Sequence, residues 1–271
     1  FNGLLLSGMC VPDLRGTQGT FGFFSTKQGG KDLESAYTGG EQTVLRRKGN
    51  RIRSRIMGPQ NSLLEGAPSM TIPFTIDVAD DQQSVTLTLD DHDGEHVLQK
   101  GEYSDWVELT FKAGLGQKVR GIARFCITQI EPELEMYMTP IHIDPENPAM
   151  PISHPFVYSI YLAKKLGKFA TLGLAEDTWA LNERVVDEEV FYKQAMFICE
   201  ERIAMFKDAL KRTKKGLVTC VFDTTDRVQH MFYRYLDPTH PANEGKDTER
   251  WKDAIAETYQ RMDAMLGDLM E

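Results

Sequence analysis

The chain has 271 residues, a formal net charge of −9 and a pI of about 5.3, which is enough length for one large domain or two ordinary ones. Its composition, 41% hydrophobic and 26% charged, is that of a globular protein with a sizeable core. The acidic balance argues against an extended nucleic-acid surface, which needs a basic face, and no apolar run is long enough to predict a membrane span.

The first segment, residues 1–16, reads as a short buried strand over Gly3–Met9 followed by a Pro12-Asp13 turn. The chain begins at Phe1 directly on this apolar run and ends in a helical pattern without a capping signal. We therefore expect an internal segment of a longer protein, in which residues 1–16 belong to an α/β core.

Residues 17–144 have a different sequence pattern, in which turn residues separate short segments that alternate between apolar and polar side chains. Period-two alternation runs through Pro73–Val78, Ser84–Leu89 and Trp106–Phe111, and the β-branched and aromatic stretches Gly121–Ile130 and Glu135–Ile143 follow. Strands of this length and spacing predict an antiparallel β-rich unit, either a sandwich or a partial barrel. We interpret this unit as an insertion, or cap, in the α/β core.

One basic cluster interrupts the β-rich segment. It consists of Arg46, Arg47, Lys48, Arg51, Arg53 and Arg55. Its neighbours are Gly49, Asn50 and Gly58, so a solvated loop or hairpin is favoured over an anion site.

Residues 145–271 have a helical and α/β texture. Apolar residues recur every three or four positions from Asp187 to about Lys214, and a continuous apolar run, Gly216–Asp223, follows. A last helical stripe comprises Trp251, Ile255, Tyr259, Met262, Leu266 and Leu269. Helix, buried strand and helix in this order are typical of a parallel α/β sheet. The overall expectation is therefore an α+β protein.

The four cysteines, Cys10, Cys126, Cys199 and Cys220, are far apart and each lies among apolar residues. Without a CxxC pair, neither a zinc ribbon nor a redox motif is indicated. Isolated, unpaired cysteines favour a reducing compartment such as the cytoplasm.

Polar side chains gather just after the run that we expect to be a buried strand. Asp223 ends that run, and Asp226 and His230 are four residues apart, so they share one face if the segment is helical. A carboxylate and an imidazole suit Zn²⁺, or Mn²⁺ and similar ions. By spacing alone, a capping aspartate followed by a surface histidine is the more ordinary interpretation.

The stretch CVFDTTDRVQHMFYRYLDPTHP, residues Cys220–Pro241, resembles the type I phosphodiesterase/nucleotide pyrophosphatase branch of the alkaline phosphatase superfamily. Three further stretches resemble large bacterial members of that family, namely GLLLSGMCVPDLRGTQGTFGFF, TPIHIDPENPAMPISHPFVY and LGLAEDTWALNE. The resemblance implies a core sheet flanked by helices, two divalent metals (zinc, with manganese as the alternative) and a Thr or Ser nucleophile that forms a phospho-enzyme.

Carried onto this sequence, the resemblance makes Asp226 and His230 two ligands of one metal. Asp223 matches no ligand position and would be a supporting or turn-capping group. The family's nucleophile and remaining ligands match no residue here, so the chain by itself is expected to be inactive and to hold no metal firmly.

Other titratable residues are candidates for the pocket. His142, Asp144 and His154 lie in a Pro-rich stretch where metal ligation, pocket lining and ordinary turn chemistry all remain open, and His240 sits in another turn. The glycines of Gly16–Gly22 could cradle a phosphate only between a strand and a helix, and β-like sequence follows them.

The sequence thus predicts an internal part of a metal-dependent hydrolase that acts on small phosphate esters, with the β-rich cap shaping the substrate site. Two alternatives stay open. One is a non-catalytic module that binds a ligand or a protein, and the other is a degenerate family member with a structural role.

Overall fold

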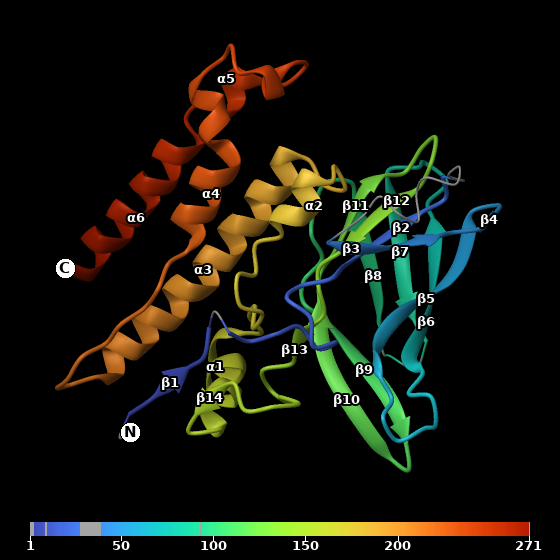
Figure 1. Cartoon of the computed structure of the whole chain (residues 1–271), viewed down its shortest axis with the longest axis horizontal. Helices are drawn as coiled ribbons and strands as arrows, with labels where there is room; N and C mark the ends of the chain where they lie inside the picture. The colour runs from blue at the N-terminus through green and yellow to red at the C-terminus, as the bar shows by residue number, and fades with distance from the viewer. Residues whose placement is uncertain (1–2, 9, 28–38, 91, 93, 271) are drawn as a thin grey trace. The chain divides into compact units, whose positions relative to one another are not determined.

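The computed structural model describes residues 3–8, 10–27, 39–90, 92 and 94–270. The chain is a mixed α+β protein that divides into two compact units, Phe1–Val190 and Phe191–Glu271 (Figure 1). We call them the β-rich unit and the helical unit. The sequence predicted boundaries after residues 16 and 144, whereas this division groups residues 145–190 with the β-rich residues.

The β-rich unit contains every strand among the described residues. The strands are β1 (Leu5–Leu6), β2 (Phe21–Ser25), β3 (Gly40–Val44), β4 (Arg47–Lys48), β5 (Arg51–Gln60), β6 (Ser69–Val78), β7 (Ser84–Leu89), β8 (Glu95–Gln99), β9 (Val107–Gly114), β10 (Gln117–Ala123), β11 (Phe125–Gln129), β12 (Glu135–Met138), β13 (His142–Ile143) and β14 (Ser153–His154). The predicted concentration of strands between Thr17 and Ile143 is confirmed.

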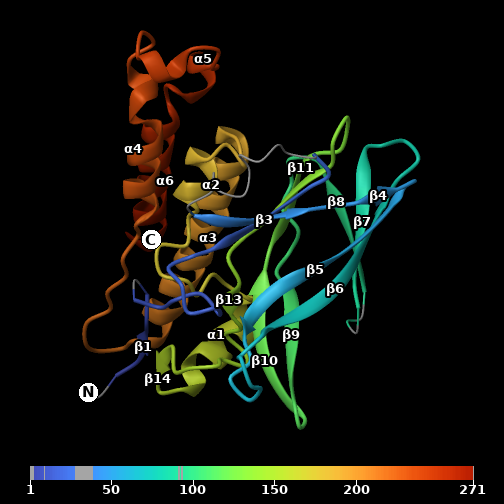
Figure 2. The same ribbon diagram turned by 45° about the vertical axis from the view of Figure 1, so that its right-hand side comes forward.

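Four sheets arise from these strands. An antiparallel sheet has the order β4-β5-β6-β7-β8, a second has the order β11-β12-β2-β3 with β2 and β3 parallel, a third is β13-β10-β9, and β1 pairs with β14. Figure 2 shows β5 and β6 as long neighbouring strands and β9 and β10 as a long hairpin. None of the described sheets closes into a barrel.

The basic cluster forms a hairpin, one of the two predicted arrangements. β4 and β5 pair antiparallel, with Lys48 opposite Arg51. On β5 the arginines at positions 51, 53 and 55 are exposed, whereas Ile52 and Ile56, on the opposite face of the strand, are fully buried. Period-two alternation therefore places the positive charge on the open face of the sheet.

The backbone of the five-stranded sheet makes a very close contact with an aromatic ring of β9. Gly58 of β5 lies against Phe111 of β9, such that a Cβ atom at position 58 would lie 2.2 Å from the Phe111 ring. Phe111 is fully buried in a core shared by three sheets, which also includes Phe74 and Phe125. Only glycine leaves room for that ring.

We predict that Gly58→Ala lowers the free energy of unfolding by about 1–3 kcal/mol, because the buried Phe111 ring cannot move aside without strain. Urea denaturation measures the loss. Gly8→Ala is the matched control in the same unit, since nothing lies within 4 Å of its added Cβ. Equal stability of the two variants would contradict the close approach.

The helices follow Pro155, as predicted. They are α1 (Val157–Leu166), α2 (Thr178–Asn182), α3 (Glu188–Arg212), α4 (Thr224–Phe232), α5 (Thr248–Trp251) and α6 (Ala254–Met270), with 3₁₀ turns η1 (Tyr233–Leu236) and η2 (Pro241–Asn243). None of the described helices is both long and apolar enough to cross a bilayer.

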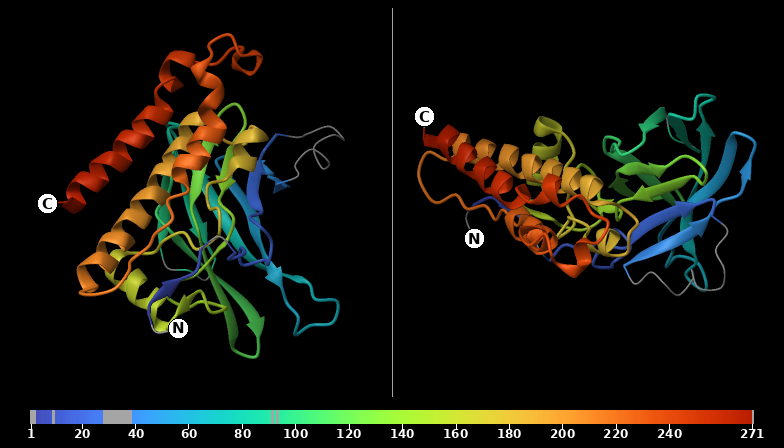
Figure 3. Two further views of the ribbon diagram at one scale, coloured as in Figure 1. Left: turned by 60° about the vertical axis from the view of Figure 1, so that its left-hand side comes forward. Right: turned by 90° about the horizontal axis from the view of Figure 1, so that it is seen from above.

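In the helical unit, α6 runs beside α3 and α4 (Figure 3). Cys199 and Ile203 of α3 are buried and pack with Met265 of α6, whereas Phe206 of the same apolar stripe is only partly buried. The predicted α6 stripe is only partly right, because Tyr259 and Leu266 are about half exposed, at 50% and 54%. The helix instead buries Ala254, Thr258 and Met265. The small side chains of Ala254 and Thr258 allow close packing.

The predicted buried strand at Gly216–Asp223 is wrong. The segment has no ladder partner among the described residues and forms no strand. Leu217 and Val221 are 86% and 68% exposed, whereas Phe222 packs against Phe206 of α3. A strand needs neighbours for its backbone groups, and the helical unit offers none, so the parallel α/β sheet expected here is absent from the described residues.

Candidate functional site

Helix α4 carries the predicted ligand pair on its open face. Thr224, Val228 and Phe232, spaced by four, are fully buried. Asp226 and His230 occupy the opposite side of the same helix, because residues two positions away lie about 200° around the axis. The sequence expectation that both side chains share one face is confirmed.

The two side chains point their donor atoms at each other. Asp226 Oδ1 lies 3.3 Å from His230 Nε2, and the side chains are 58% and 72% exposed. Zinc binds carboxylate oxygen and imidazole nitrogen at about 2.0–2.2 Å with tetrahedral angles, so two such ligands lie about 3.3–3.5 Å apart. The pair therefore has the spacing of one edge of a tetrahedral metal site. The same spacing also fits an ordinary surface ion pair at i, i+4.

Asp223, at the start of α4, has a different role. Its side chain makes no capping hydrogen bond to the helix. Instead it forms an ion pair with Arg202 of α3, and both groups are largely buried, at 12% and 18% side-chain exposure. This pair ties the start of α4 to α3, so Asp223 supports the helix that carries Asp226 and His230.

The described residues supply only these two donors. No group of three or more His, Cys, Asp or Glu side chains among them could hold a metal ion. A stable zinc site has three or four protein ligands. Asp226 and His230 alone would therefore fill only part of a metal's coordination shell.

His142, a predicted pocket residue, is part of the core of the β-rich unit. Its Nδ1 accepts hydrogen bonds from the backbone N–H groups of Thr171 (3.0 Å) and Leu172 (3.1 Å), and its ring packs edge-on against Trp106. Burial, with a smaller effect of Arg124, lowers the pKa of His142 to about 3. The imidazole is thus neutral, with one nitrogen already occupied, and it holds two chain segments together.

Asp144 is as buried as His142, and its carboxylate oxygens also have hydrogen-bond donors within the protein. Its carboxylate accepts from the Asn147 amide (2.8 Å), the Glu146 backbone N–H (3.0 Å) and Lys168 Nζ (2.9 Å). Lys168 also lies 3.0 Å from Glu108. Asp144 therefore anchors the Pro-rich loop to Lys168 and has no free face for a ligand.

The two remaining predicted residues do not join a site. His154 is exposed on β14, opposite Leu5 of β1. His240 is exposed and caps η2, with Nδ1 accepting from the Ala242 backbone N–H at 3.2 Å. The structure brings together Asp226 and His230, but it places His142 and Asp144 in separate hydrogen-bond networks.

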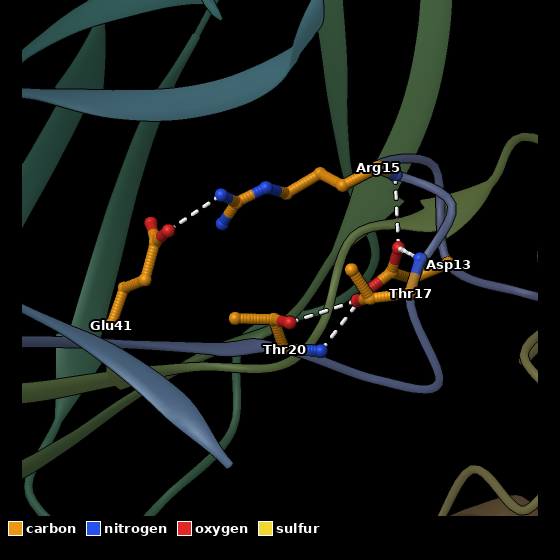
Figure 4. Close-up of polar contacts among 5 residues, drawn as sticks. All are labelled: Asp13, Arg15, Thr17, Thr20 and Glu41. Carbon is orange, nitrogen blue, oxygen red and sulfur yellow. Dashed lines mark hydrogen bonds and ion pairs between the residues drawn. The ribbon is translucent and has the colours of Figure 1, made fainter. Parts of the chain in front are cut away.

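Sequence reasoning missed Asp13, which organises the glycine-containing loop after it (Figure 4). The buried carboxylate accepts from the backbone N–H groups of Arg15, Thr17 and Thr20, each at 2.9 Å, and from the Thr17 hydroxyl. Gly16 takes a positive φ of 82°. The loop amides turn toward this carboxylate, so they are not available to a phosphate. An Asp followed by Gly and Thr was the available signal for such a turn.

Arg15 closes this loop by reaching Glu41 of β3, with 2.6 Å between Nη2 and Oε1. The hollow that these two residues line, together with Thr20, has a volume of only about 10 Å³. That is room for about one water molecule. The Asp13 loop is therefore a structural element rather than a substrate site.

No protein-family model, curated protein or solved structure matches the chain.

We predict that His142→Asn removes a pH dependence of stability, because an asparagine oxygen can replace Nδ1 as acceptor without titrating. The folded pKa of about 3 lies below the ordinary 6.5, so the unfolded chain binds the proton more readily. Stability from this group is complete above about pH 6.5 and is lost as pH falls toward 3. Wild type should lose about 2 kcal/mol more than the variant between about pH 7 and pH 5, measured by urea denaturation at each pH.

A second buried group should act with the opposite sign. Asp177 caps α2 and accepts from the Tyr137 hydroxyl at 2.8 Å. Burial raises its pKa to about 6. Stability from this group is complete below the unfolded value of 3.8 and is lost as pH rises through 6. Asp177→Asn, which retains a capping oxygen, should therefore lose about 1 kcal/mol less than wild type between about pH 5 and pH 7. Parallel pH profiles for the variant and wild type would contradict the shift.

Proposed function

We propose that this chain is part of a metal-dependent hydrolase of small phosphate esters, in which Asp226 and His230 hold one edge of a divalent metal ion. The observation that carries the proposal is the 3.3 Å separation of Asp226 Oδ1 and His230 Nε2 on the exposed face of α4. The resemblance of Cys220–Pro241 to the phosphodiesterase family supports the same pair.

The chemistry of the donors supports zinc as the first choice. A carboxylate and an imidazole are common zinc ligands, and manganese accepts the same set. Two such ions, when bound, would supply Lewis-acid polarisation of the phosphoryl group and activation of the nucleophile. Asp226 would contribute a carboxylate oxygen and His230 an imidazole nitrogen, while the Arg202–Asp223 pair fixes the start of their helix.

The proposal includes the finer fold assignment. Residues 1–16 and 145–271 would belong to an alkaline phosphatase-like core, and residues 17–144 would form a cap that shapes access for the substrate. The nucleophile and the remaining ligands would come from residues outside this chain. The chain by itself would then bind zinc weakly and hydrolyse nothing.

Zinc titration of the isolated chain tests the ligand pair. Because each side chain supplies one donor of the pair, Asp226→Ala and His230→Ala should each weaken zinc binding by at least about tenfold, as measured by calorimetry. Asp263→Ala is the matched control, since it removes an exposed carboxylate from α6 in the same unit. Equal affinity in all four proteins would remove the pair from the proposal.

The catalytic part is tested in the gene product that contains this chain, with a chromogenic phosphodiester as substrate. Loss of a residue behind a metal ligand already costs about 10–100-fold, so Asp226→Ala should lower kcat by more than about 100-fold, whereas Asp263→Ala should leave it unchanged. Full activity of Asp226→Ala would show that the resemblance is a coincidence of spacing. Metal-dependent hydrolysis by the isolated chain would show that the catalytic groups lie within it.

A further inference from the structure

A hollow of about 400 Å³ lies beside the β9–β10 hairpin of the β-rich unit. It is lined by Lys118, Val119 and Arg120 of β10 and by Asn147, Pro148 and Ala149 of the following loop. This volume falls within the range of small-molecule pockets, about 300–1,000 Å³. It is far larger than the hollow below Arg15 and Glu41, at about 10 Å³.

Positive charge gathers on the side of the hairpin that borders the hollow. Lys118 and Arg120 are two positions apart and so lie on one face of β10, about 7 Å apart along the strand. The strand register places Lys118 directly opposite Lys112 of β9. Like charges in direct cross-strand positions destabilise a sheet, so an anion at this position would relieve their repulsion.

Nearby carboxylates do not neutralise these two cations. Lys168 holds Asp144 at 2.9 Å, Glu108 at 3.0 Å and Glu146 at 4.0 Å. Among the described residues, neither Lys118 nor Arg120 forms an ion pair or a side-chain hydrogen bond. Lys168 therefore pairs with the three nearby carboxylates. Lys118 and Arg120 line the hollow without a paired negative charge from the described part of the chain.

The opposite wall of the hollow is fixed in place. The Asn147 backbone N–H and side-chain amide both donate to Asp144, at 3.2 Å and 2.8 Å. Asp144 is itself held by Lys168 and by the antiparallel pairing of β13 with β10. A ligand would thus enter a hollow whose loop wall is already ordered, which lowers the entropy cost of binding.

We propose that this hollow binds a small phosphorylated molecule, with its phosphate group held by Lys118 and Arg120. Two adjacent cations suit a phosphate dianion better than a single carboxylate, and the guanidinium fork matches phosphate oxygens. The remaining volume, beside Pro148 and Ala149, accommodates the organic part. None of the lining residues is aromatic, so the hollow lacks the stacking platform of a single-stranded nucleic-acid site. This site does not depend on the metal pair of α4.

The test is a calorimetric titration of the full chain at low salt with inorganic phosphate and, separately, phenyl phosphate. A chelator is present throughout, so that no metal at Asp226 and His230 can bind phosphate. We expect saturable binding at one site, tighter for phenyl phosphate. Arg120→Gln and Lys118→Gln should each weaken binding about tenfold or more, as expected for the loss of a hydrogen bond to a charged group.

Arg55→Gln is the matched control, because Arg55 is an exposed strand arginine of the same unit that does not line the hollow. Its affinity for both ligands should equal that of wild type, and circular dichroism checks that all three variants are folded. Absence of saturable binding, or an equal loss in Arg55→Gln, would overturn the site. Binding of inorganic phosphate with exclusion of phenyl phosphate would overturn the assignment to a phosphorylated small molecule.

Discussion

Backbone hydrogen bonding decides which apolar segments of this chain become strands. β6 lies between β5 and β7 and keeps its ten residues extended and half buried. The run Leu217–Phe222 is just as apolar, but among the described residues it has no neighbour to complete a ladder. It therefore stays irregular, with Leu217 and Val221 in solvent. The helix that follows presents Asp226 and His230 on an open surface instead of at the edge of a sheet.

Hydrogen bonding also separates the polar groups that stabilise the fold from those that are available to bind a ligand. Asp13, His142 and Asp144 are buried, and backbone amides or Lys168 occupy their acceptor atoms. Such groups cannot bind a ligand without leaving an amide unpaired, which costs about 1–3 kcal/mol each. Asp226 and His230 are exposed and bound only weakly to each other, so a metal can replace their contact at little cost.

The sequence predicted well those features that depend on local pattern. Alternation located β6, β7 and β9, and the three-to-four spacing located α3. It failed where distant partners decide the outcome. The stripe through Tyr259 and Leu266 looked buried, but the folded helix buries Ala254 and Thr258 instead. The buried strand at Leu217–Phe222 depended on a sheet that no local pattern could supply.

The candidate site shows the same division. The i, i+4 spacing of Asp226 and His230 predicted one shared helix face, because that follows from helix geometry alone. The Pro-rich stretch could not be interpreted in this way, since burial of His142 and the pairing of Asp144 with Lys168 both depend on contacts more than twenty residues away in sequence. Asp13 was missed because its partners are backbone amides, which every residue type except proline supplies.

The central claim is that Asp226 and His230 act together as ligands of one metal ion. A crystal structure of the zinc-saturated chain, with the metal located by anomalous scattering at the zinc edge, tests it most directly. The account predicts a zinc ion within about 2.0–2.2 Å of both Asp226 Oδ1 and His230 Nε2, with α4 unchanged. Zinc bound elsewhere, or bound to His230 alone with Asp226 turned away, would contradict it.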